Sequence, residues 1–271
     1  MTPQSYVLTD SLTMLRRNLR RMIRYPTMIV MVIGMPVIFL LLFVYVFGGT
    51  LGAGLGTGSH EQFSGQAGGR AAYVNYVSPA IMLMTVTAVV QGTATSVATD
   101  MTEGIIARFR TMSIARVSVL TGHVLGSLIQ VVLGVAVVTG IELLIGFRPT
   151  AGLGGWLGAT GILLAAAFAL IWLSVALGQA SNSVETASNL PLPMMLLIFL
   201  GSGFVPTDSM PAGLRWFAEY QPFTPIMETL RHLLAGEPAG STAIIALGWC
   251  VAILLGGYFW SRKLFNREYS G

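Results

Sequence analysis

Long apolar runs dominate the pattern of hydrophobic and polar positions along this chain of 271 residues. Six stretches carry no Asp, Glu, Lys or Arg, and they cover 25–60, 71–99, 117–141, 149–184, 186–207 and 238–261. A helix that crosses a bilayer needs about 20 mostly apolar residues, so each stretch has room for one crossing. The pattern predicts six transmembrane helices, at roughly 28–47, 73–98, 118–145, 155–178, 188–204 and 241–261.

The segments outside these spans are amphipathic or rich in glycine. Residues 5–25 repeat apolar positions every three to four residues, with five arginines between them, which predicts a basic helix in the membrane interface. Both a mechanical role and simple anchoring fit this helix. Nine glycines predict a flexible loop over 48–72. Residues 206–236 hold two short amphipathic pieces, the second with Thr224 as N-cap, and we expect a re-entrant or interfacial pair after a short fifth span.

Composition excludes a soluble protein and most site chemistry. Hydrophobic residues make up 54% of the chain and charged residues 10%, whereas soluble domains carry about 25% charged residues. The single cysteine, Cys250, rules out an intrachain disulfide, and the histidines, His60, His123 and His232, are too widely spaced to suggest a metal site. No P-loop motif occurs, so no cofactor is expected in this chain.

Basic residues predict the orientation. An even number of spans places both termini on one side, and Arg and Lys gather on the cytoplasmic side of membrane proteins. With the N-terminus inside, eleven basic residues lie inside and four outside, the outer four being Arg70, Arg148, Arg215 and Arg231. Both termini are therefore predicted to be cytoplasmic.

The loop at 100–116 is the longest polar segment between predicted spans on the cytoplasmic side. Ile105, Ile106, Phe109 and Met112 follow helical spacing, which indicates a short helix parallel to the membrane. Acidic residues lie near its start and basic residues near its end, as the helix dipole favours. The bulky Phe109 between two arginines fits a groove on a partner protein, but an ordinary basic inner loop fits equally well.

Six features occur in the order found in a known family, over nearly the whole chain. They are the basic N-terminal helix, Phe47-Gly48-Gly49 at the end of the first span, Glu103-Gly104-x-x-x-Arg108-Phe109-Arg110, Gly146-Phe147-Arg148, Val205-Pro206 with Met210-Pro211, and Gln221-Pro222-Phe223-Thr224-Pro225. With these features the chain resembles an ABC-2-type transporter permease of the daunorubicin-resistance (DrrB-like) family. It departs from the family at Met112-Ser113, where Leu-Pro is usual, and at Gln221, where Asn is common.

The resemblance implies the type V ABC exporter fold, an all-α polytopic membrane protein with six transmembrane helices. Residues 5–25 would be its interfacial connecting helix, 100–116 its cytoplasmic coupling-helix loop, and 206–236 its outer re-entrant helices, all in one transmembrane domain of residues 1–271. The resemblance implies that movement of the ATPase passes through five residues of the loop. They are Glu103, Gly104, Arg108, Phe109 and Arg110.

The resemblance also implies that spans two and five of two subunits line the transport path. Seven residues in these spans are candidates for that lining: Met82, Met84, Thr85, Gln91, Met194, Met195 and Phe199. Thioether and aromatic side chains adapt to apolar, amphipathic molecules, but lipid-facing or packing roles fit the same residues. Glu142, the one carboxylate predicted inside a span, is a functional candidate, or it reaches the surface or pairs with Arg148.

The sequence therefore predicts the permease subunit of an ATP-driven exporter in the bacterial cytoplasmic membrane. It would move a drug, lipid or secondary metabolite with two P-loop ATPase subunits, which hold ATP and Mg²⁺, and with a second copy or a homologous permease. Membrane lipids are expected partners and nucleic acid is not. The alternative is an ATP-independent secondary transporter or channel, although no convincing internal repeat is found. A membrane enzyme is disfavoured because Glu142, His123 and Asp208 are scattered.

Overall fold

The computed structural model describes residues 26–54, 69–102 and 116–267, and all regular secondary structure in these ranges is helical. The long helices are α2 (Pro26–Leu41), α5 (Arg70–Thr102), α7 (Arg116–Ile145), α8 (Leu153–Ala180) and α13 (Gly240–Arg267). The short ones are η1 (Leu42–Phe47), α3 (Gly48–Gly54), α9 (Val184–Asn189), α10 (Leu192–Phe199), η3 (Thr207–Ser209), α11 (Ala212–Tyr220) and α12 (Phe223–Leu234). The helix predicted at 5–25 and the core of the loop at 100–116 lie outside the described residues.

Five helical segments are long and apolar enough to cross a membrane. They are Val32–Gly52, Arg70–Thr102, Thr121–Ile145, Leu153–Ala180 and Gly240–Leu264. Each overlaps one of the spans expected from the charge-free runs, namely 28–47, 73–98, 118–145, 155–178 and 241–261. The described chain is thus an all-helical, multi-pass membrane protein.

The span expected at 188–204 is built differently from the other five. Two short helices, α9 and α10, cover Val184–Phe199, and the chain then turns through residues 200–204 without forming helix. Pro191 and Pro193 stand at the α9–α10 junction, where their missing N–H groups cost least. At about 1.5 Å per residue, the eight residues of α10 rise only about 12 Å. This part of the chain therefore forms two short helices and a turn, rather than the single helix that was expected.

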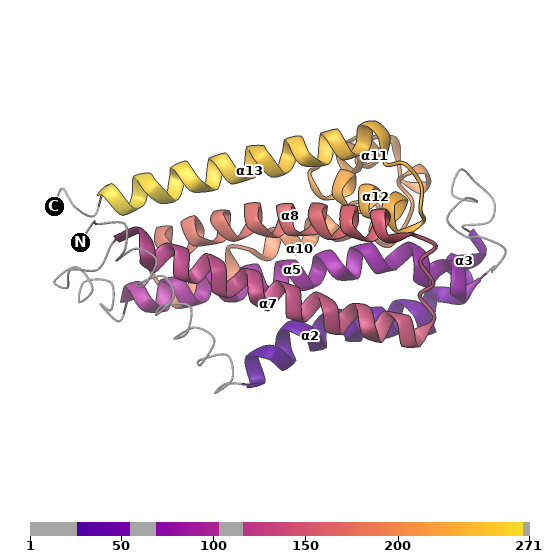
Figure 1. The fold of residues 1–271 in the computed structure, drawn as a ribbon, viewed down its shortest axis with the longest axis horizontal. Coiled ribbons are helices and arrows are strands. Elements are labelled where there is room, and N and C mark those ends of the chain that lie inside the picture. The colour runs from indigo at the N-terminus through magenta and orange to yellow at the C-terminus, as the bar shows by residue number, and fades with distance from the viewer. Residues whose placement is uncertain (1–25, 55–68, 103–115, 268–271) are drawn as a thin grey trace.

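Helix α5 forms the centre of the bundle. It packs against α2, α3, α7, α8, α9, α10 and α12, and most of its side chains are buried. Small residues bring the neighbouring helices close: a Cβ at Gly178 of α8 would lie 2.6 Å from the Ala94 carbonyl oxygen. Close backbone approach at small residues is the usual way in which membrane helices pack. Figure 1 shows α5 running along the bundle beneath α8 and beside α7.

The first span continues past its predicted end. Gly48 and Gly49 were expected to begin a flexible loop, but α3 extends the helix to Gly54. Gly52 lies so close to the chain at Gly69 that a Cβ there would overlap the Gly69 carbonyl group. Here the glycines allow close packing of α3 against the start of α5, so the prediction of a loop is wrong for residues 48–54.

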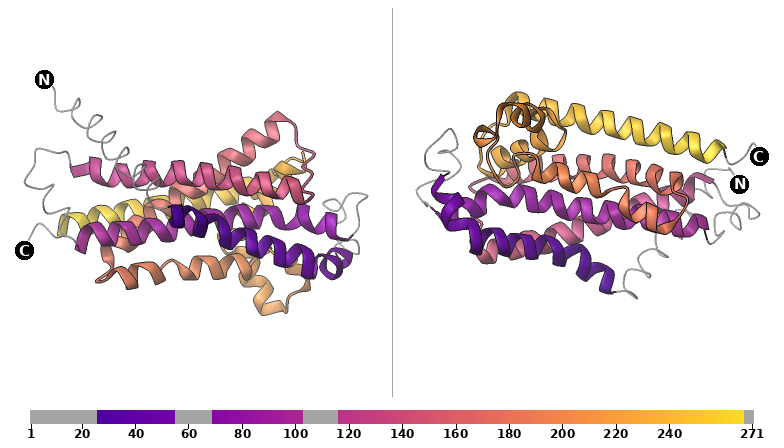
Figure 2. Two further views of the ribbon diagram at one scale, coloured as in Figure 1. Left: turned by 90° about the horizontal axis from the view of Figure 1, so that it is seen from below. Right: turned by 180° about the vertical axis from the view of Figure 1, so that it is seen from behind.

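The two ends of the bundle carry different elements. Helices α3, α11 and α12 lie at one end, which we call the α12 end (Figure 1). The opposite end, the α9 end, holds the last turn of α5, the first turn of α7 and helix α9 (Figure 2). Helix α2 begins and helix α13 ends toward the α9 end (Figure 1).

Candidate functional site

The residues proposed for coupling, Glu103, Gly104, Arg108, Phe109 and Arg110, all lie outside the described residues. The helices on either side of them are joined by a buried polar contact. Asp100 of α5 and His123 of α7 meet at 3.1 Å between Oδ2 and Nε2, and both side chains are buried. Two turns further into the bundle, the hydroxyls of Thr93 and Ser127 are 2.7 Å apart. These contacts hold α5 and α7 together directly beside the loop.

The structure does not gather the seven path candidates on one surface. Met82, Met84 and Thr85 are buried in the packed interior around α5, and Met194 is buried on α10. Gln91 is half-buried and donates from Nε2 to the Ser188 carbonyl, which fastens α9 to α5. Met195 is half-buried on α10, and the Phe199 ring stacks on Phe204 with centroids 4.6 Å apart. Their role in transport stays a prediction.

One face of α5 is left uncovered by the rest of the described chain. Gly92 is exposed, and Ala88, Gln91, Thr95 and Thr99 along the same face are half-buried. Thr95 and Thr99 donate to the carbonyls four residues earlier, so their hydroxyl groups are satisfied within the helix. The face is mildly polar and lies beside α9 in the half of α5 nearest the α9 end.

The most developed polar site lies at the α12 end, where residues 200–204 interrupt the helical path after α10. We call these five residues the helix break. Outside a helix, main-chain carbonyls in a membrane need other donors, because an unsatisfied carbonyl is costly there. The Ser202 carbonyl accepts from the Tyr76 hydroxyl at 2.8 Å, and the Phe204 carbonyl accepts from the Tyr73 hydroxyl at 3.1 Å. Side chains of α5 therefore replace the missing helical donors.

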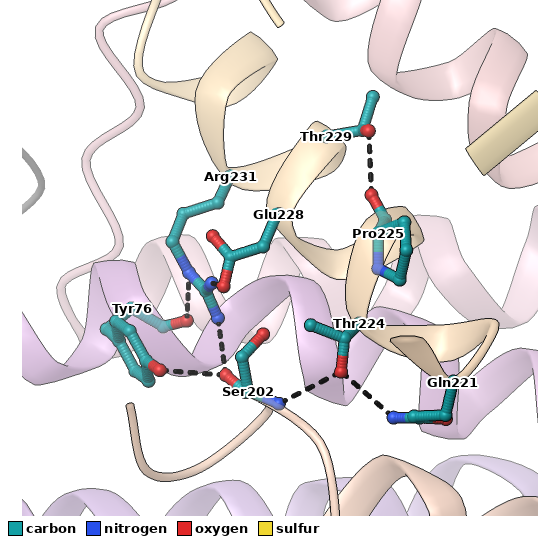
Figure 3. A network of polar contacts seen from close by, with 8 residues as sticks. All are labelled: Tyr76, Ser202, Gln221, Thr224, Pro225, Glu228, Thr229 and Arg231. Carbon is teal, nitrogen blue, oxygen red and sulfur yellow. Dashed lines mark hydrogen bonds and ion pairs between the residues drawn. The ribbon is translucent and has the colours of Figure 1, made fainter. Parts of the chain in front are cut away.

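Helix α12 supplies the other donors and acceptors for the helix break. Gln221, just before α12, donates to the Leu197 carbonyl and to the Thr224 hydroxyl, both at 2.9 Å. The Thr224 hydroxyl in turn accepts from the Ser202 amide at 3.3 Å. Thr224 thus binds the helix break instead of capping α12 as predicted, and α12 begins at Phe223. Figure 3 shows Gln221, Thr224 and Ser202 joined in this order.

Arg231 of α12 lies at the centre of this network and is only 2% exposed. Its Nε donates to the Tyr76 carbonyl at 3.2 Å and its Nη2 to the Ser202 carbonyl at 2.9 Å (Figure 3). Its Nη1 forms an ion pair with Glu228 at 2.6 Å, and the guanidinium lies 3.9 Å from the centre of the Tyr76 ring. Burial works to lower the pKa of Arg231, but Glu228 and the other partners raise it above its usual range, so the group stays charged.

From the sequence, Arg231 is predicted only to be one of four outer basic residues. A usable signal was present, because Met227, Leu230 and Leu234 place Arg231 on the apolar face of an amphipathic helix. A charged residue on such a face, with an acidic residue three positions earlier, indicates a buried pair.

Helix α11 contrasts with α12 because nearly all of it is exposed. Ala218 is its one buried residue, while Trp216 and Tyr220 are about two-thirds exposed. Arg215 forms ion pairs with Asp208 at 2.6 Å and with Glu219 at 2.7 Å, and these groups are also exposed. Aromatic side chains of this kind are common at membrane–water interfaces.

Comparison with known proteins decides the family. The model of the ABC-2 type transporter family matches residues 9–235, which is most of the chain. The chain belongs to the ABC-2 type transporter family. This family supplies the membrane component of ABC transporters, and the ATPase lies in a partner subunit.

Individual ABC-2 permeases are 28% identical to this chain over the residues that align. The daunorubicin resistance ABC transporter permease protein DrrB1 of Streptomyces coeruleorubidus is 28% identical over 228 residues, which cover 83% of this chain and 75% of the relative. A probable doxorubicin resistance ABC transporter permease protein, DrrC of Mycobacterium tuberculosis, is 28% identical over 153 residues, which cover 55% and 54% of the two chains. The resemblance to the daunorubicin-resistance permeases is thereby confirmed.

Glu142 of this ABC-2 permease is fully buried on α7. Its two carboxyl oxygens have no hydrogen-bond partner among the described residues. Arg148, which was considered as its partner, donates instead to the carbonyls of Leu143 and Phe147. Neither pairing with Arg148 nor an approach to the surface is observed, so Glu142 remains a functional candidate.

Proposed function

We propose that this chain is the transmembrane permease subunit of an ATP-driven ABC exporter that moves a hydrophobic or amphipathic compound out of the cell. The family match over residues 9–235 is the observation that carries the proposal. No Gly-x-x-x-x-Gly-Lys-Ser/Thr motif occurs anywhere in the 271 residues. The phosphates of ATP and the accompanying Mg²⁺ are therefore assigned to a separate P-loop subunit.

The proposed orientation places the α9 end in the cytoplasm of a bacterium and the α12 end outside the cytoplasmic membrane. Eleven of the fifteen Arg and Lys residues belong to the segments before the first predicted span, between the second and third, and after the last, and this excess supports the orientation. In this arrangement the loop 103–115 meets the ATPase, and Glu103, Gly104, Arg108, Phe109 and Arg110 pass on its movement. The contact between Asp100 and His123 supports this role because it joins the two helices that carry the loop.

The proposed assembly contains two permeases and two ATPase subunits. The uncovered face of α5 supports a second permease, because a face with Gln91, Thr95 and Thr99 fits protein or a hydrated path better than lipid. The second subunit is a copy of this chain or a homologous permease. Among the path candidates, Gln91, Met195 and Phe199 are partly exposed before the second subunit is added, so they are the first to test.

Relatives named for resistance to daunorubicin and doxorubicin support an amphipathic aromatic compound as the transported class. The test uses inside-out vesicles from cells that co-express this chain and the ATPase encoded beside it. Daunorubicin, whose fluorescence reports its movement, is the probe. We expect uptake that requires hydrolysable ATP and disappears when the P-loop lysine of the ATPase is replaced by alanine.

Uptake that does not depend on ATP hydrolysis would contradict this function. Uptake that continues with the inactive ATPase and stops when an ionophore collapses the proton gradient would identify an ATP-independent secondary transporter. Within an active complex, Arg108→Ala and Phe109→Ala are expected to lower the amount of daunorubicin moved per ATP. Wild-type transport and ATP hydrolysis in both variants would disprove the role of these residues in coupling.

A further inference from the structure

Helix α5 reaches from the cytoplasmic loop to the helix break. Its 33 residues run from Arg70 to Thr102, and the loop begins at the next residue. Near its other end, Tyr73 and Tyr76 donate to the Phe204 and Ser202 carbonyls. A helix of this length rises about 50 Å, enough to cross a bilayer and extend beyond it. Displacement of the cytoplasmic end of α5 therefore has a direct structural route to residues 200–204.

Arg231 joins three elements at that point. One guanidinium contacts the Tyr76 carbonyl on α5, the Ser202 carbonyl in the helix break and the Glu228 carboxylate on α12. The Tyr76 ring packs against the same group. A planar guanidinium has donors in fixed directions, which a lysine ammonium lacks. The arrangement thus sets the position of α12 relative to both α5 and the helix break.

We propose that Arg231 and Tyr76 form a permanent tie that makes α12 and the helix break follow α5 during transport. Movement imposed on the cytoplasmic end of α5 then reaches the outer helices as a displacement of one block. Arg231 and Tyr76 are positioning residues in this proposal. The inference rests on the proposed function, because the tie matters for transport only if an ATPase moves the loop.

Burial favours a permanent tie over a latch that opens in every cycle. Arg231 is almost completely buried, and separating it from its partners would leave a buried charge unpaired and remove one donor each from the Tyr76 and Ser202 carbonyls. Helix α11 shows what a loosely attached outer element looks like. It is buried at Ala218 alone, and the ion pairs of Arg215 are exposed to solvent, which can replace them.

The first experiment asks whether the tie opens. The native cysteine is replaced (Cys250→Ala), and Ser202→Cys introduces a thiol in the helix break. Ser202 is 1% exposed, and its hydroxyl has no hydrogen-bond partner among the described residues, so the exchange removes no described hydrogen bond from it. The reconstituted complex is treated with a membrane-impermeant maleimide, with and without ATP and vanadate. We expect slow labelling in both states, and labelling at least about fivefold faster when Tyr76→Phe or Arg231→Lys is added.

The second experiment asks whether the tie carries movement. Proteoliposomes containing the complex are assayed for daunorubicin moved per ATP hydrolysed. Tyr76→Phe removes one hydroxyl and keeps the ring, whereas Arg231→Lys keeps the charge and removes the planar guanidinium with its donors in fixed directions. We expect both to lower the ratio at least about fivefold while ATP hydrolysis continues. Arg215→Lys is the matched control, an exposed arginine of α11 whose ion pairs are with Asp208 and Glu219, and its ratio should equal that of the wild type.

The results distinguish a permanent tie from a contact that opens in each cycle and from a contact that has no role in coupling. Labelling of Ser202→Cys only in the nucleotide-bound state would show that the contact opens in each cycle, and would overturn a permanent tie. If Tyr76→Phe and Arg231→Lys move as much daunorubicin per ATP as the wild type, the coupling role is overturned. If the lysine variant does not fold, the result for Tyr76→Phe alone decides. If the wild-type complex shows no ATP-dependent transport, the proposed function fails instead, and the labelling still reports whether the contact stays closed.

Discussion

At the scale of single residues, the helix break depends on side chains that supply what a helix normally supplies to itself. Residues 200–204 have lost their helical donors, and Tyr73, Tyr76 and Arg231 donate to their carbonyls instead. The two tyrosines come from positions more than a hundred residues away along the chain, whereas Arg231 lies 29 residues after Ser202. A buried charge in such a place is stable only while its partners remain.

Replacing Arg231 by alanine should therefore destabilise the protein strongly. The change removes the cation that pairs with Glu228 and one donor each from the Tyr76 and Ser202 carbonyls, and a loss of about 3–5 kcal/mol is typical when one partner of a buried ion pair is removed. The measurement is the midpoint of thermal unfolding in detergent, with Arg215→Ala as control because its ion pairs are exposed. Equal midpoints in the two variants would show that the buried network contributes little to stability.

At the scale of elements, small residues set how closely the helices approach α5. Gly178 of α8 lies against the Ala94 carbonyl and the Val97 side chain, whereas a Cβ at Gly161 of the same helix would meet nothing within 4 Å. Two glycines in one helix therefore have different reasons to be there. One sets the distance to α5, and the other faces open space.

Gly178→Ala is expected to push α8 away from α5 and destabilise the bundle by about 1–3 kcal/mol, as overpacking does. Gly161→Ala should leave stability unchanged or slightly higher, because alanine is the better helix former. Both variants are compared by the temperature at which each loses its monodisperse peak in size-exclusion chromatography. A similar loss in both would indicate that helix flexibility matters more than spacing.

At the scale of the whole molecule, the arrangement separates an end that bears the loop from an end that bears α11 and α12. The predicted orientation places the α9 end inside the cell. Asn182 lies between α8 and α9, Ser209 lies in η3 before α11, and both are exposed. These two positions give a direct measure of which end faces the cytoplasm.

In a Cys250→Ala background, Ser209→Cys should react with a membrane-impermeant maleimide in intact cells. Asn182→Cys should react only after the membrane is permeabilised. The physical reason is the excess of arginine at the α9 end, which favours its retention on the cytoplasmic side. The reverse labelling pattern would invert the orientation, and with it the direction assigned to transport.

The sequence by itself determined that this is a membrane protein and located five of its long apolar helices. Charge-free runs of this length are rare in soluble proteins, so they indicate helices that cross a membrane. It also indicated the family, because the short motifs that resemble the family can be recognised without knowing which residues are in contact. It misplaced the end of the first span. The glycines that follow this span were interpreted as a flexible loop, but they allow α3 to pack against Gly69. Local composition cannot distinguish a flexible glycine from a closely packed one.

Only the tertiary structure decided what the polar residues near the α12 end do. Arg231 was predicted to be an outer basic residue and Thr224 a helix cap, yet both bind the helix break. Their partners depend on where the chain stops being helical after Phe199 and on which helix passes beside that point. Hydrogen bonds between different elements are set by the packing of α5, α10 and α12, and packing is a property of the folded chain.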